Sequence, residues 1–66
     1  MMDDLGYEAG RNEGQHWMTE ILKTHDRYTA HELYKARMEE RTGGRGLSTF
    51  ETGFFAGAKQ VLNGAV

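Results

Sequence analysis

The stretch "GYEAGRNEGQHW", residues 6–17, places a glycine at every fourth position, at Gly6, Gly10 and Gly14. A glycine inside a helix costs about 0.5–1 kcal/mol relative to alanine. The surrounding residues nevertheless have helical periodicity, because the large apolar side chains fall on one face: Tyr7, Trp17, Met18, Ile21 and Leu22. The glycines lie within that face. We therefore expect them to allow the backbone of a second helix to approach more closely than the usual 8–10 Å between axes.

The rest of the chain predicts two more helices and no strand. The three helical segments cover about residues 4–23, 30–41 and 49–63, and no proline interrupts them. The stretch 42–46 contains three glycines and reads as a flexible turn. The sequence therefore predicts an all-α fold, a single three-helix domain over residues 1–66.

The third helix repeats the four-residue glycine spacing, at Gly53 and Gly57. The simplest arrangement packs the first and third helices together, with aromatic rings at the ends of the contact. The residues expected to make this packing are Gly6, Gly10, Gly14, Gly53, Gly57, Phe50 and Phe54. Leucine at Gly10 or Gly14 is then expected to destabilise the fold, whereas one methyl group is expected to be tolerated better.

Capping patterns set the expected helix ends. Ser48 and Glu51 have the spacing of a capping box, as do Thr29 and Glu32. Tyr28 and Leu33 stand where a hydrophobic staple would close the start of the second helix, whose apolar stripe would then be Ala30, Leu33, Tyr34 and Met38. Gly43 and Gly64 are expected to end the second and third helices.

Composition excludes several classes of protein. The chain has no cysteine, and its net charge is −2. No segment has the features of a secretory signal or is apolar enough to cross a membrane, so we expect a complete, cytoplasmic protein. The acidic excess lies in residues 1–33, which hold seven acidic and three basic residues. This balance does not indicate bulk attraction to nucleic acid.

No pattern indicates a metal, a cofactor or a catalytic site. The histidines, His16, His25 and His31, do not have the spacing of a zinc site even with Asp26 as a fourth ligand. Glu13, His16 and Glu20 lie on one helix face, where such residues usually form surface pairs. We expect no enzyme activity, no metal and no cofactor.

Basic side chains recur at Arg37, Arg41 and Arg45. This row supports an alternative function, a small regulator bound to nucleic acid. The third helix argues against direct reading of bases, because its early positions are phenylalanine and glycine and Lys59 is its one basic residue.

The segments "GYEAGRNEG" and "GFFAGAKQVLNG" resemble the short glycine-periodic helices of small accessory proteins of bacteriophages and mobile elements. The resemblance implies a small protein that binds a host or defence protein, as an inhibitor or adaptor. The residues expected to contact such a partner are Glu8, Glu13, Glu20, Trp17, Arg37, Arg41 and Arg45. The acidic face of the first helix is expected to meet a basic surface. A structural homo-oligomer, formed because one chain does not cover Trp17 and Phe54, is the remaining alternative.

Overall fold

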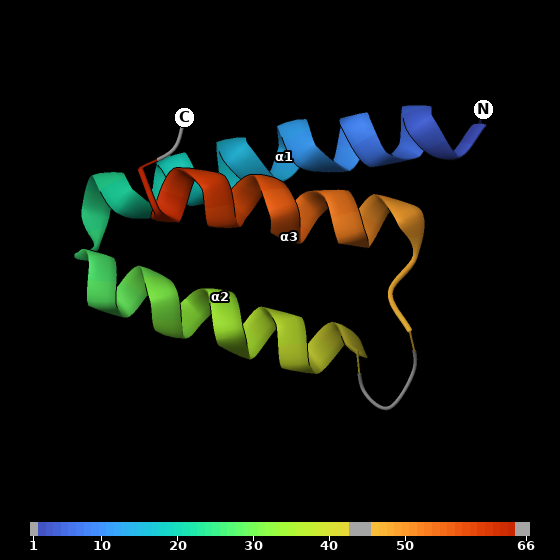
Figure 1. The fold of residues 1–66 in the computed structure, drawn as a ribbon. Helices are drawn as coiled ribbons and strands as arrows, with labels where there is room; N and C mark the ends of the chain where they lie inside the picture. The colour runs from blue at the N-terminus through green and yellow to red at the C-terminus, as the bar shows by residue number, and fades with distance from the viewer. Residues whose placement is uncertain (1, 43–45, 65–66) are drawn as a thin grey trace.

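The chain forms three helices in the computed structural model, which describes residues 2–42 and 46–64. They are α1 (Met2–Thr24), α2 (Arg27–Thr42) and α3 (Thr49–Leu62). Figure 1 shows α1 and α3 side by side and running in the same direction, with α2 returning antiparallel to both. The described residues contain no strand. The all-α class and the packing of the first helix against the third are therefore confirmed.

The glycines of α1 place the two parallel helices in backbone contact. A Cβ at Gly10 would overlap the carbonyl oxygen of Phe50 and lie 3.0 Å from the nitrogen of Phe54. A Cβ at Gly14 would overlap the carbonyl oxygen of Phe54 and lie 3.0 Å from the nitrogen of Ala58. These atoms belong to the backbone of a helix, so they cannot move aside as a flexible side chain would. Only glycine fits these two positions.

The glycines of α3 make the same contact in the other direction. A Cβ at Gly53 would overlap the carbonyl oxygen of Tyr7, and a Cβ at Gly57 would overlap that of Arg11. The direction of a missing Cβ is also that of a Cα hydrogen, so each glycine directs a C–H group at a carbonyl oxygen across the interface. Such Cα–H···O contacts stabilise the folded chain by about 0.5–1 kcal/mol each.

The interface has an internal two-fold character. The segments "YEAGRNEG" (7–14) and "FETGFFAG" (50–57) share an aromatic residue, a glutamate and two glycines at equivalent positions. In this alignment Tyr7 corresponds to Phe50, and Gly10 corresponds to Gly53. The contact of Gly10 with Phe50 is therefore equivalent to the contact of Gly53 with Tyr7. One contact scheme is therefore used twice. Gly6 does not belong to it, because a Cβ there would meet only the Thr49 methyl group at 3.9 Å.

A line of aromatic rings joins the three helices. Trp17 of α1 lies 5.3 Å from Phe54, Phe54 lies 5.3 Å edge-to-face from Phe55, and Phe55 lies 5.8 Å edge-to-face from Tyr34 of α2 (ring centroids). Burial raises the pKa of Tyr34. Phe55, which is not among the residues expected from the sequence to pack the third helix, is 3% exposed. It is buried because α3 lies between two helices and uses two faces.

Two residues expected from the sequence to be packed are more than a third exposed. Phe50 is 42% exposed and Leu33 is 39% exposed. Met18, Ala30 and Ala58 are fully buried at the points where the helices meet.

The expected start of the second helix is wrong by three residues. Asp26, not Thr29, caps α2: the Thr29 backbone N–H donates to the Asp26 carboxylate at 2.7 Å. The bond lowers the pKa of Asp26. Tyr28 is 76% exposed, so it does not form the predicted staple with Leu33. The helix begins early because Asp26, a strong N-cap residue, follows α1 almost directly.

The caps of α3 agree with the sequence. The Ser48 N–H donates to the Glu51 carboxylate at 3.0 Å, and the Glu51 N–H donates to the Ser48 hydroxyl at 3.1 Å. Gly64 has a φ of 73° and ends the helix in the left-handed region. Gly43, the predicted end of the second helix, lies outside the described residues.

Candidate functional site

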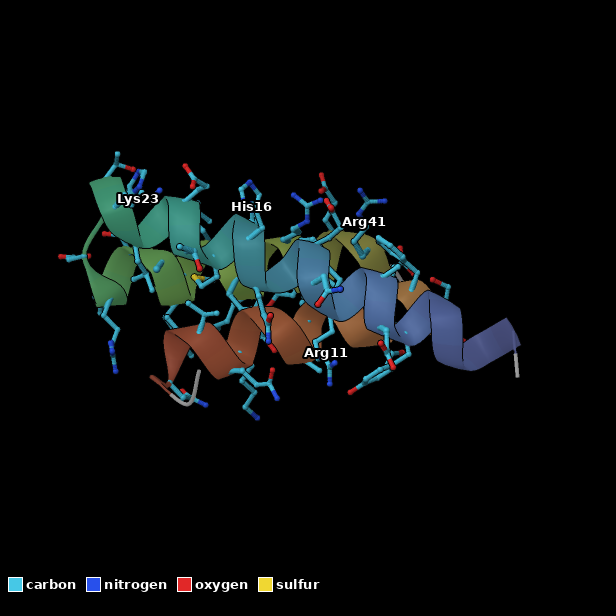
Figure 2. The ribbon with its side chains drawn as sticks, turned by 90° about the horizontal axis from the view of Figure 1, so that it is seen from above. Arg11, His16, Lys23 and Arg41 are labelled. Atoms are coloured by element: carbon cyan, nitrogen blue, oxygen red, sulfur yellow. The ribbon has the colours of Figure 1, made fainter. Side chains whose placement is uncertain are left out.

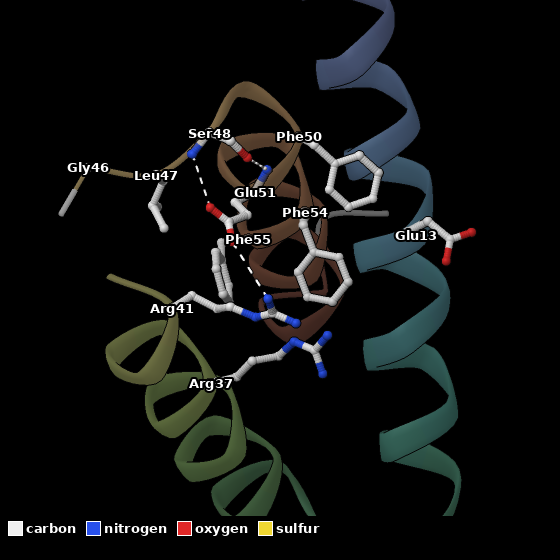
Figure 3. A pocket seen from close by; sticks show the side chains of 10 residues that line it. All are labelled: Glu13, Arg37, Arg41, Gly46, Leu47, Ser48, Phe50, Glu51, Phe54 and Phe55. Carbon is white, nitrogen blue, oxygen red and sulfur yellow. Dashed lines mark hydrogen bonds and ion pairs between the residues drawn. The ribbon is translucent and has the colours of Figure 1, made fainter. Parts of the chain in front are cut away.

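A groove of about 620 Å³ lies over the N-terminal half of α3, between α1 and the C-terminal half of α2. Figure 3 shows Phe54 and Phe55 of α3 at its floor and Arg37 and Arg41 of α2 along one side. Phe50 forms the upper part near α1. The volume falls in the range of pockets that bind ligands or partner side chains. Aromatic and arginine side chains are also the types enriched in protein interfaces.

Arg37 crosses the groove from α2 towards α1. Its guanidinium carbon lies 4.7 Å from the centroid of the Phe54 ring and 4.9 Å from that of Trp17. A cation over an aromatic face is attracted by the negative face of the ring. Two rings therefore fix the guanidinium while its N–H groups keep their capacity to donate.

Arg41 lies one turn further along α2 and is held by a carboxylate. Its guanidinium is 3.8 Å from the Glu51 carboxylate, which also accepts the Ser48 N–H in the capping box. The start of α3 is thus linked to the end of α2 across the top of the groove. No ion pair to Arg37 is present among residues 2–42 and 46–64. The two arginines therefore differ: one is neutralised locally and the other is not.

Four of the residues predicted to contact a partner come together here. Arg37 and Arg41 line the groove, Trp17 supports Arg37, and Glu13 lies at the rim on α1. In Figure 3 the Glu13 carboxylate points away from both arginines. The rings of Trp17 and Phe54 lie 5.3 Å apart, and within one chain Phe54 is buried while Trp17 is half-buried.

The remaining predicted contact residues lie elsewhere. Glu8 and Glu20 are exposed on α1 and do not line the groove. The Lys23 ammonium lies 2.9 Å from the Glu20 carboxylate, which lowers the pKa of Glu20. Arg45 lies outside the described residues.

The groups considered for catalysis or metal binding are dispersed over the surface. Figure 2 shows His16 on the side of α1 away from α3, and Glu13, His16 and Glu20 are all exposed. No cluster of three metal-ligating side chains occurs in the part of the chain that the structure describes. Nor does any described helix combine the length and apolarity needed to span a bilayer.

The sequence did not indicate that residues of all three helices line one groove. Phe55 and Leu47 line it but belong to no predicted site. A usable signal was present for Leu47, an apolar residue directly before the N-cap Ser48. The groove itself arises because α2 and α3 lie further apart at the C-terminal end of α2, as Figure 1 shows, and no local pattern encodes this divergence.

Comparison of the chain with protein-family models, curated proteins and solved structures gave no match.

Proposed function

We propose that this chain is a small, non-catalytic protein-binding module, and that the groove over α3 is its binding surface. The single observation that carries the proposal is Arg37, held over Trp17 and Phe54 without a carboxylate partner in the described residues. Arginine and aromatic residues at the centre of a hollow are typical of interface hot spots. Phe50, 42% exposed beside them, supplies apolar surface for a partner to cover.

A protein partner is favoured over nucleic acid. Phosphate backbones are bound by cations displayed outward along a surface. Arg37 instead lies across aromatic rings inside the groove, and Arg41 is already paired with Glu51.

Inhibition or bridging of a second protein is the form of binding that we propose. The resemblance to accessory proteins of bacteriophages and mobile elements supports it, as does the position of the acidic residues Glu8 and Glu13, which are exposed on α1 and free to meet a basic rim on the partner.

The test is site-specific photo-crosslinking in the cells that make the protein. A photoreactive phenylalanine analogue replaces Phe50 in the groove, and a matched control replaces Tyr28, which is more exposed but does not line the groove. We expect one covalent adduct with a second polypeptide from position 50 and none of that mass from position 28. Equal adducts from both positions, or no adduct from position 50, would contradict the proposal.

A further inference from the structure

Resting on the function proposed above, we infer that the partner places an α-helix in the groove. This helix presents a carboxylate to Arg37. It also presents an apolar side chain, three or four residues from the carboxylate, to Phe50.

The secondary structure of the chain points to a helical occupant. Two common ways to bind a peptide are to add a strand to a sheet edge and to lay a helix in a groove. The described residues hold no strand, so the first mode has no template here. The groove is bordered by α1 and α2 over α3, and all three helices lie roughly along one direction. A fourth helix in this position completes a four-helix arrangement.

The charge of the groove points to a carboxylate. Arg37 is half-buried, and its cation is stabilised by ring faces rather than by an opposite charge. Arg37 lines the groove, and Figure 3 shows its guanidinium below the Phe54 ring and beside that of Arg41. A planar guanidinium matches a carboxylate in two parallel hydrogen bonds. A partner carboxylate would therefore accept hydrogen bonds from the Arg37 guanidinium, which the two rings already hold in place.

The apolar requirement comes from Phe50 and Leu47. Phe50 is 42% exposed, and Leu47 is half-buried at the same end of the groove. Phe50 is four residues, about one helical turn, from Phe54, which contacts Arg37. An apolar side chain one turn from the carboxylate therefore matches this spacing.

A second copy of the chain does not fit this site well. On a second copy, the exposed apolar residue with a carboxylate three or four positions away is Tyr28, and the carboxylate is that of Glu32. Arg37 lies about two and a half turns after Tyr28, on the opposite side of α2. Copies joined in this way would form open chains rather than a closed dimer.

The experiment selects binders for the full chain from a display library of helical peptides with one randomised face. We expect the selected peptides to be enriched in Asp or Glu three or four residues from Leu, Phe or Trp. A synthetic peptide of the selected sequence should change the emission of Trp17, the single tryptophan, which contacts Arg37. Its affinity should fall about tenfold or more for Arg37→Gln, fall less for Arg37→Lys, and stay unchanged for Lys35→Gln on the exposed side of α2. Circular dichroism confirms that each variant is folded.

The alternative outcomes separate this inference from the proposed function. Binders lost on Phe50→Glu but not enriched in acidic residues would keep the groove as the binding surface and overturn the carboxylate. Binders insensitive to both Phe50→Glu and Arg37→Gln, or no binders at all, would overturn the groove itself. Binding of a short DNA duplex that is lost on Arg37→Gln would overturn the protein partner. Sedimentation that depends on concentration and is abolished by Tyr28→Ser would identify the occupant as a second copy and overturn the inference.

Discussion

Gly14 of α1 and Phe54 of α3 are in direct backbone contact: the Cα of the glycine faces the carbonyl oxygen of the phenylalanine with no space for a side-chain atom between them. The ring of the same residue, Phe54, contacts Trp17 and Arg37. One residue thus joins the helix contact to the candidate site, and the predictions below address both.

Alanine at Gly14 should destabilise the fold, although alanine is the better helix former. Propensity favours alanine by about 0.5–1 kcal/mol. The added methyl group would overlap a carbonyl oxygen that belongs to the backbone of α3, so the two helices must separate. We expect the free energy of unfolding to fall by about 1–3 kcal/mol in a urea titration. The expectation that a methyl group is better tolerated here is thereby revised.

Gly6→Ala is the matched control for this substitution. Its Cβ would make an ordinary contact, 3.9 Å from the Thr49 methyl group. Propensity should then act alone and stabilise the protein by about 0.5–1 kcal/mol. A change of the same sign at Gly6 and Gly14 would show that helix contact does not explain the glycine at position 14.

Phe55 and Phe50 should differ strongly when each is replaced by alanine. Phe55 is 3% exposed and contacts the rings of both Phe54 and Tyr34, so its loss should cost about 3–5 kcal/mol. Phe50 is 42% exposed, and its loss should cost less than about 1.5 kcal/mol. Thermal melts of the two variants measure the difference. Equal costs would mean that α2 is not attached to α3 through Phe55.

Arg37→Ala should weaken the attachment of α2 to the other helices and change the environment of Trp17. A cation over two rings in a half-buried position contributes on the order of 1 kcal/mol. Chemical denaturation followed by tryptophan emission reports both effects in one experiment. Lys35→Ala, exposed on the same helix, should stay within about 0.5 kcal/mol of the parent chain.

Asp26 should make stability depend on pH in the acid range. The Thr29 N–H lowers the pKa of Asp26 below its ordinary value of 3.8 in the folded chain. The unfolded chain therefore binds the proton first, and the stabilisation is present above the ordinary pKa. It is lost as pH falls through the lowered value.

Melting temperatures measured between pH 6 and pH 2 check this expectation. Asp26→Asn keeps a capping oxygen without the charge and should remove this part of the pH dependence. Thr29→Ala should change the melting temperature little, because Asp26 is the cap. A large loss at Thr29 would instead restore the capping box predicted from the sequence.

Local patterns were sufficient where each structural feature depends on neighbours in the chain. The three helices follow from apolar periodicity, and the Ser48–Glu51 capping box needs only four consecutive residues. The packing of α1 against α3 could be predicted from the glycine spacing. Each glycine destabilises its own helix, so four-residue repeats of glycine in both helices indicate a close contact between their backbones.

The sequence was insufficient where two nearby residues could each cap the same helix, or where a feature depends on packing between helices. Asp26 and Thr29 are both good N-cap residues three positions apart, and the short connection after α1 selects the first. Phe55 is absent from the packing residues predicted for the third helix because that prediction assumed one buried face, whereas α3 has two. The groove depends on how far α2 diverges from α3, and no short sequence motif encodes this divergence.

The paired glycine contact also limits how this chain can diverge. At Gly10, Gly14, Gly53 and Gly57 a replacement larger than hydrogen meets backbone, and no compensating change in a side chain can make room. In most cores a larger side chain can be compensated by a smaller one beside it. At these four positions no such second substitution can compensate for the first. Phe50 of the groove is different, because its side chain is 42% exposed and can be exchanged for others at a much smaller cost. The protein thus combines a framework fixed by four positions that admit no side chain with a candidate site whose exposed residues are free to vary.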